Sequence, residues 1–280
     1  MSEDMSIDEP FHIEQEGAIS GLNPMFGEWQ KTFKFAPVPY RDGSERRKQF
    51  RQEMQEQMTN KWSYSHEVKV YITLYLDVQK VLETSETADL DNYAKAILDG
   101  LKGHSGIMFD DTQVQSLSVH WVDALTESCF TVETKSSPDD FVLKPTEFFE
   151  MPDGLWYPNG HYVWSKNGAK LLCERDFFAG LSILEMMSSV KNKARLELRK
   201  TGFPHRHAYY RSSYVSSLAR GFHRSRLEDS GFTLHRRRDW QERRQRWKED
   251  NPGDLEPIEK VISDAQQNYR SMIDLLAGNF

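Results

Sequence analysis

Residues 68–76 alternate between apolar and other side chains without a break, through Val68, Val70, Ile72, Leu74 and Leu76. A period of two is the pattern of a β-strand that buries one of its faces. This is the clearest strand signal in the chain. It predicts a sheet that has at least one covered face.

A helix is predicted downstream of this strand. After Asp91 the apolar positions recur at steps of three and four residues, and the pattern ends at the glycines between 100 and 106. This is helical periodicity followed by a helix end. At about 100° per residue, Asp91, Lys95 and Asp99 share one polar face, and the apolar positions face a core.

Other periodic segments surround these two elements. They are a strand at 32–38, a helix at 44–58 with exposed basic side chains, and two strands at 117–121 and 130–132 that the connection 123–127 joins as a hairpin. The order strand, helix, strand, helix, strand, strand predicts the α+β class. We expect a small mixed sheet with helices on one face, followed by a mostly helical C-terminal extension.

Acidic residues are crowded around the helix that follows Asp91. Six candidate residues, of which four are carboxylates, one is an amide and one is a lysine, fall within 23 positions: Asp89, Asp91, Asn92, Lys95, Asp110 and Asp111. Such carboxylates repel one another unless they share a cation or a proton. The pattern therefore favours a divalent-metal site, and a metal beside a lysine suits phosphodiester hydrolysis.

Each of these residues also has an ordinary structural interpretation. Asp89 or Asp91 could simply cap a helix, and Asp110 and Asp111 could form a plain turn before a strand. Lys95 could form a salt bridge with an aspartate one helical turn away.

The ordered pattern D-L-D-N-x-x-K at 89–95, followed by D-D-x-x-V at 110–114, resembles the RusA family of Holliday-junction endonucleases (crossover junction endodeoxyribonucleases). The resemblance covers about residues 30–135. It implies a structure-selective DNA endonuclease that resolves four-way DNA by paired phosphodiester hydrolysis in recombination and repair. It also implies a homodimer with one active site for each cut strand.

The resemblance assigns roles to particular residues. Asp89, Asp91 and Asp111 match the acidic motif and would hold Mg²⁺, or Mn²⁺ as a substitute. Asp110 is a second candidate ligand, because adjacent side chains on a strand do not readily face one site. Lys95 matches the family lysine and would act on the scissile phosphate. The alternatives are a nuclease for other branched DNA such as flaps, and a catalytically inert DNA-binding or recombination accessory protein.

The chain is expected to divide into a mobile acidic arm at 1–28, the RusA-like nuclease core at 29–136, and the extension at 137–280. Within the extension, residues 137–160 have a loop-like pattern, and helices are predicted at 171–200, 211–226, 239–249 and 258–276. No motif identifies the extension, so its role and its protein partner stay open.

The net charge of −7 is unevenly distributed. Residues 191–250 contain 17 Lys and Arg against 7 Asp and Glu, a net charge of +10. A basic segment on an acidic chain indicates a nucleic-acid contact, and a solvated helix surface is the equal alternative. Within it, His205 and His207 could be metal ligands or phosphate contacts, although a basic surface loop is favoured. Tyr209 and Tyr210 permit base stacking but are more typical of a core.

The sequence contains no apolar run long enough to span a membrane, and its first residues lack the basic and apolar regions of a signal peptide. Cys129 and Cys173 have no CxxC or CxxH partner, which disfavours zinc and fits a reducing compartment. We therefore expect a cytoplasmic or nucleoid-associated protein without a membrane partner.

Overall fold

The computed structural model describes residues 22–23, 27–85, 87–124, 127–137, 140–165, 168–213 and 220–278. The chain forms two compact units. The first unit comprises residues 1–145, 162–170 and 226–232, and the second comprises 146–161, 171–225 and 233–280. The first unit therefore contains segments from both halves of the sequence. Of the predicted acidic arm at 1–28, residues 1–21 and 24–26 lie outside the described residues.

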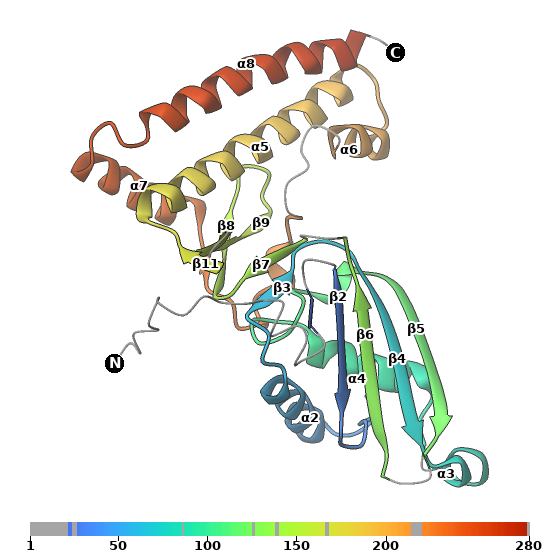
Figure 1. Ribbon diagram of the computed structural model, residues 1–280. Helices are drawn as coiled ribbons and strands as arrows, with labels where there is room; N and C mark the ends of the chain where they lie inside the picture. Colours follow the sequence, from blue (N-terminus) through green and yellow to red (C-terminus); the bar gives the residue numbers. More distant parts are fainter. Residues whose placement is uncertain are drawn as a thin grey trace. The chain divides into compact units, whose positions relative to one another are not determined.

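A five-stranded mixed sheet forms the centre of the first unit (Figure 1). Its strands, in spatial order, are β1 (Leu22–Asn23), β2 (Glu28–Phe33), β6 (Cys129–Lys135), β4 (Val68–Leu76) and β5 (Val114–Asp123). β5 pairs with β4 in parallel, and the other neighbours are antiparallel. The strand predicted at 68–76 is confirmed at its predicted bounds, and its five alternating apolar side chains are all buried.

Two helices cover one face of this sheet (Figure 1). α2 (Ser44–Gln57) and α4 (Leu90–Leu101) contact each other, and their buried side chains join those of β4 in one core. Gly100 permits this contact, because a Cβ atom there would collide with the side chain of Met54. Both helices and the α+β class with helices on one face are confirmed.

The path of the chain decides which residues lie near each end of α4. β4 is followed by the short helix α3 (Val78–Glu83), then by α4 and β5. Because β5 is parallel to β4, α4 runs back from the carboxyl ends of these strands toward their amino ends. The N-terminus of α4 therefore lies at one end of the sheet, and the residues just before β5 lie at the other.

The hairpin predicted between residues 117–121 and 130–132 is wrong. Strands β5 and β6 exist, but β4 lies between them and pairs with both. In the connection, the backbone N–H of Ala124 donates to the carbonyl of Leu76 at the end of β4, at 2.8 Å. The start of the connection, at Ala124, therefore lies at the end of β4. A strand this apolar is best placed centrally, where both of its edges are paired.

Two further sequence predictions need correction. The strand predicted at 32–38 lies instead at 28–33, as β2, and prolines at 37 and 39, which cannot donate ladder hydrogen bonds, disfavour a strand beyond it. The segment 137–160, predicted as loop-like, contains three strands: β7 (Phe141–Leu143), β8 (Thr146–Glu150) and β9 (Trp156–Gly160). Its aromatic side chains are mostly buried, and Pro158 is tolerated because β9 is an edge strand.

The second unit confirms the mostly helical extension. Its helices are α5 (Glu174–Lys200), α6 (His205–Ser213), α7 (Arg237–Asp250) and α8 (Glu256–Gly278). A three-stranded sheet in the order β12 (Leu234–His235), β8, β9 accompanies them. The remaining strands pair in twos, β3 (Trp62–Tyr64) with β7 and β10 (Tyr162–Ser165) with β11 (Gly168–Leu171).

The helix predicted at 211–226 is wrong in part. α6 begins earlier, at His205, and Arg224–Arg226 form only a short 3₁₀ turn. Residues 214–219 lie outside the described residues. Among the helices that the structure describes, none combines the length and the apolar character needed to cross a membrane.

Candidate active site

Two carboxylates stand at the start of α4. Asp89 is the N-cap residue and Asp91 lies in the first turn, and both are exposed. The backbone of Asp89 is extended, as at an N-cap, but its carboxylate makes no capping hydrogen bond. The ordinary capping role is therefore not observed for the Asp89 side chain. Both carboxylates remain available beside the positive end of the helix dipole.

Lys95 follows Asp91 by one helical turn and contacts an aromatic ring. Its Nζ atom lies 3.8 Å from the ring centroid of Tyr40, and the Cζ atom of Arg47 lies 4.1 Å from the same centroid. The backbone N–H of Tyr40 donates to the carbonyl of Asn92 at 2.9 Å, which anchors the ring beside the first turn of α4. Among the described residues Lys95 forms no ion pair, so the predicted salt-bridge alternative is not observed.

Two cations on one ring create a positively charged corner. Arg47, as the main cause, and Lys95 lower the pKa of the Tyr40 hydroxyl below its usual value. Such a corner suits an anion such as a phosphate oxygen. Sequence reasoning missed Tyr40, because no periodic pattern connects residue 40 with the start of α4.

Asp110 stabilises a turn. It is 3% exposed, and its Oδ1 atom accepts hydrogen bonds from the backbone N–H of Thr112 at 3.0 Å and from the Thr112 hydroxyl at 2.6 Å. The side chain of Gln113 completes a capping box by accepting from the backbone N–H of Asp110 at 3.1 Å. The plain-turn interpretation therefore holds for Oδ1 of Asp110.

Asp111 belongs to a charged cluster at the far end of α4. Its Oδ2 atom lies 3.3 Å from Nζ of Lys102, which also contacts Oδ1 of Asp99 at 2.6 Å. Its Oδ1 atom lies 3.9 Å from Nη1 of Arg226. Burial alone would lower the pKa of Lys102, but the hydrogen bond to Asp99 and the charges of both carboxylates raise it above its usual value.

The four acidic residues therefore do not form one cluster within a single chain. α4 has 12 residues, so at 1.5 Å per residue about 16 Å of helix separates Asp91 from Lys102, the partner of Asp111. Among the described residues, no three His, Cys, Asp or Glu side chains are placed to hold a metal ion. Carboxylate oxygens are the donors that Mg²⁺ prefers. Within one chain, however, their geometry does not fit a metal shared by Asp91 and Asp111.

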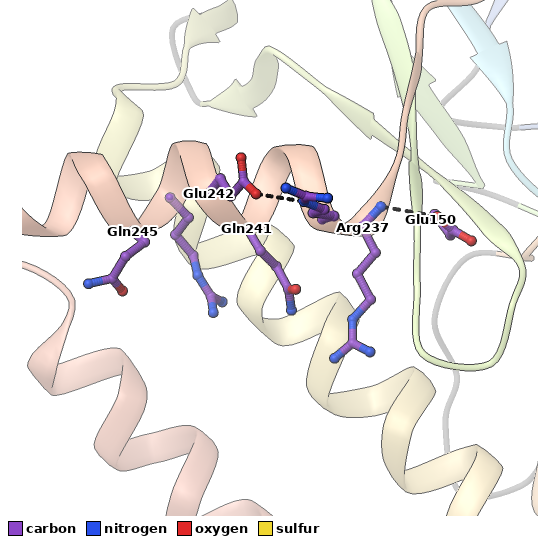
Figure 2. Close-up of a pocket in the computed structure, with 7 residues that line it drawn as sticks. Glu150, Arg237, Gln241, Glu242 and Gln245 are labelled. Carbon is purple, nitrogen blue, oxygen red and sulfur yellow. Dashed lines mark hydrogen bonds and ion pairs between the residues drawn. The ribbon is translucent and has the colours of Figure 1, made fainter.

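The arginine-rich helix α7 forms a second candidate site, on the second unit. Glu185 of α5 accepts hydrogen bonds from Arg237, Gln241 and Arg244, with 2.8 Å to Nη2 of Arg237 and 3.3 Å to Nη1 of Arg244. Figure 2 shows the hollow that Arg237, Gln241 and Gln245 line beside Glu150. Further ion pairs join Arg238 to Glu242, Arg243 to Glu174 and Lys248 to Glu259. Most cations of α7 are thus paired inside the unit, which favours the solvated-surface interpretation for this helix.

This network predicts a stability effect. Glu185→Ala removes the shared acceptor of Arg237, Gln241 and Arg244, of which Arg244 keeps the hydroxyl of Ser182 at 2.8 Å. It should lower the free energy of unfolding by about 1–3 kcal/mol, since the side chains involved are partly exposed. Urea unfolding of the full chain measures it. Glu197→Ala serves as the control, since among the described residues its side chain pairs only with the exposed Lys200. Equal midpoints for the two variants would contradict a structural role for Glu185.

The first unit combines a mixed sheet with a helix that carries exposed carboxylates and a lysine, the features of a candidate nuclease domain. Residues 23–132 of the chain match the family model Endodeoxyribonuclease RusA, and this match covers less than half of the 280 residues. The resemblance to the RusA family is therefore confirmed over this segment. It supports a nuclease, that is, a hydrolase acting on DNA. A search of curated proteins found no match.

Proposed function

We propose that this protein is a divalent-metal-dependent endonuclease that resolves four-way DNA junctions by paired phosphodiester hydrolysis in recombination and repair. The observation that carries the proposal is the RusA match over residues 23–132, which includes the exposed Asp89, Asp91 and Lys95 at the start of α4. The match supports the nuclease class. The junction substrate, the metal and the dimer are the finer parts of the proposal.

Mg²⁺ is the proposed cofactor, with Mn²⁺ as a substitute. Asp89 and Asp91 would supply ligands from the start of α4, and Asp111, with Asp110 as the second candidate, would supply them from the segment before β5. A bound ion of this kind activates water and stabilises the leaving oxygen. Lys95, held on the Tyr40 ring, would bind the scissile phosphate.

A homodimer would bring the separated carboxylates together. Along the polar face of α4 the charges alternate in sign, at Asp91, Lys95, Asp99 and Lys102. Two copies of α4 packed antiparallel about a two-fold axis would set Lys95 of one copy against Asp99 of the other. The same arrangement would bring Asp91 of one copy toward Asp111 of the second. Each dimer would then contain two composite sites, one for each strand that is cut.

The direct test is a cleavage assay on labelled four-way junction, flap and duplex DNA, with and without Mg²⁺. We expect Mg²⁺-dependent paired incision of the junction in preference to the other substrates. If the protein cuts flaps and leaves four-way junctions uncut, its substrate is another kind of branched DNA. Binding without cleavage of any substrate in Mg²⁺ or Mn²⁺ would favour the inert accessory protein.

Lys95→Ala should lower the cleavage rate by about 10²-fold and change junction affinity little, because a charge that acts mainly on the transition state contributes little to ground-state binding. Single-turnover cleavage and junction binding measure the two effects separately. Lys48→Ala is the matched control, since Lys48 is exposed on α2 and, within the described part of the chain, pairs only with Glu45. Parallel losses of folding stability and activity in Lys95→Ala would instead identify Lys95 as a structural residue.

A further inference from the structure

The excess positive charge of the extension is concentrated at the end of α5 and in α6. Residues 191–213 contain seven Lys and Arg and a single acidic residue, Glu197, which leaves a net charge of +6. α7 contains six Lys and Arg and four acidic residues, a net charge of +2, and carboxylates pair most of its cations. The segment 191–250 is basic as a whole, but these two parts of it are unlike.

Cations in the first of these parts are available to a ligand. Lys193, Arg199 and Arg206 are exposed, and none of them forms an ion pair within the described part of the chain. α6 itself contains no acidic residue. An anionic partner would therefore meet uncompensated positive charge here.

Two aromatic rings stand beside these cations. α6 buries Ala208 and Ser212, whereas Tyr209 is 48% exposed and Tyr210 is 60% exposed. The interpretation of these tyrosines as core residues is therefore wrong. The Cζ atom of Arg195 lies 4.9 Å from the Tyr209 ring centroid, so the guanidinium group already covers one face of that ring. Tyr210 is the more exposed ring.

Tyr210 shares one hollow with basic side chains. Arg206, His207, Tyr210 and Arg211 line this hollow, and we call these four residues the α6 surface. Positions 206 and 210, and positions 207 and 211, are four apart and so lie on one face of the helix. The histidine pair predicted in a surface loop thus lies on an exposed helix, where His207 contributes to this surface.

We propose that the α6 surface binds single-stranded DNA, with Arg206 contacting a phosphate and Tyr210 stacking on a base. The net charge of +6 favours a polyanion over an ordinary protein surface. An exposed ring between cations favours unpaired bases, because the faces of bases in a duplex are already stacked on their neighbours. This inference goes beyond the proposed nuclease activity and does not depend on the carboxylates of α4.

The experiment measures binding of the full chain to a fluorescein-labelled oligo(dT) and to a duplex of equal length, by anisotropy over a range of NaCl concentrations in EDTA. EDTA excludes metal-dependent cleavage, so this result is independent of whether the protein cuts junctions. We expect tighter binding of oligo(dT) than of duplex. Tyr210→Ala should weaken oligo(dT) binding about five- to 100-fold, and Tyr210→Phe should keep most of the affinity.

Charge variants provide the second readout. Arg206→Gln should lower the slope of log K against log[NaCl] for oligo(dT) by about 0.7, the value for one lost phosphate contact. Arg246→Gln removes the same charge from an exposed position of α7 and should leave the slope unchanged. Unchanged binding by both Tyr210→Ala and Arg206→Gln, or equal effects of Arg206→Gln and Arg246→Gln, would overturn the proposal. Circular dichroism of each variant checks that it is folded.

Discussion

Asp91→Asn is expected to abolish DNA cleavage, with a rate at least about 10²-fold below that of the unchanged protein. Loss of a residue that only orients a metal ligand already lowers activity by up to about 10²-fold, and loss of the ligand itself should lower it at least as much. Junction binding should be kept or strengthened. Asp91 is exposed at the start of α4, and replacing it would remove a negative charge that faces phosphate in the proposed complex. Single-turnover cleavage in Mg²⁺ and gel-shift titration in EDTA measure the two properties.

The matched control is Asp264→Asn, which makes the same change of charge at an exposed position of α8. It should cleave and bind as the unchanged protein does. Near-normal turnover of Asp91→Asn in Mg²⁺ would show that Asp91 is not a metal ligand. A parallel loss of cleavage, binding and thermal stability would assign it a structural role.

Mixing two inactive variants should restore activity if the site is composite. Asp91→Asn and Asp111→Asn homodimers would each lack a ligand in both sites. In a mixed dimer, one site would carry both substitutions and the other would carry neither. After free exchange of subunits about half of the dimers are mixed, so about a quarter of the normal number of sites should recover. These dimers should nick one strand of a junction without making the paired incision.

Denaturing gels distinguish single nicks from paired incision, and size-exclusion chromatography of differently tagged variants confirms that subunits exchange. The control mixes Asp91→Asn with Asp89→Asn, two substitutions at the same end of α4, which should not complement. If exchange is complete and no nicking returns in the first mixture, Asp91 and Asp111 act within one chain. The antiparallel α4 arrangement would then be wrong.

Local periodicity predicted the elements that bury one continuous stripe. β4 and α4 appear at nearly their predicted bounds, because alternation or a three- and four-residue repeat directly reflects which side of an element is buried. The same reasoning placed Asp91, Lys95 and Asp99 on one polar face of the helix, and Asp91 and Lys95 are exposed. The strands within 137–160 were not predicted, because short aromatic strands interrupted by prolines have no sustained periodicity.

Contacts between distant segments lay beyond this reasoning. The placement of β4 between β5 and β6 depends on which strands share its edges. Residues 226–232 join the first unit, where the ring of Phe232 lies 5.6 Å from that of Phe109 and the carbonyl of Ser230 accepts from the backbone N–H of His104 at 2.9 Å. A protein shortened to the predicted core would therefore lack part of the first unit.

By itself the sequence determined the α+β class, the RusA resemblance and the residue types of the candidate site, because these follow from local patterns and from an ordered motif. Only the tertiary structure decided that Asp91 and Asp111 mark opposite ends of α4, that Tyr40 contacts Lys95, and that α7 is internally paired while Tyr210 is exposed. These properties arise from side chains that meet through packing. Distances between segments far apart in the chain are set by the whole core, and no local pattern encodes them.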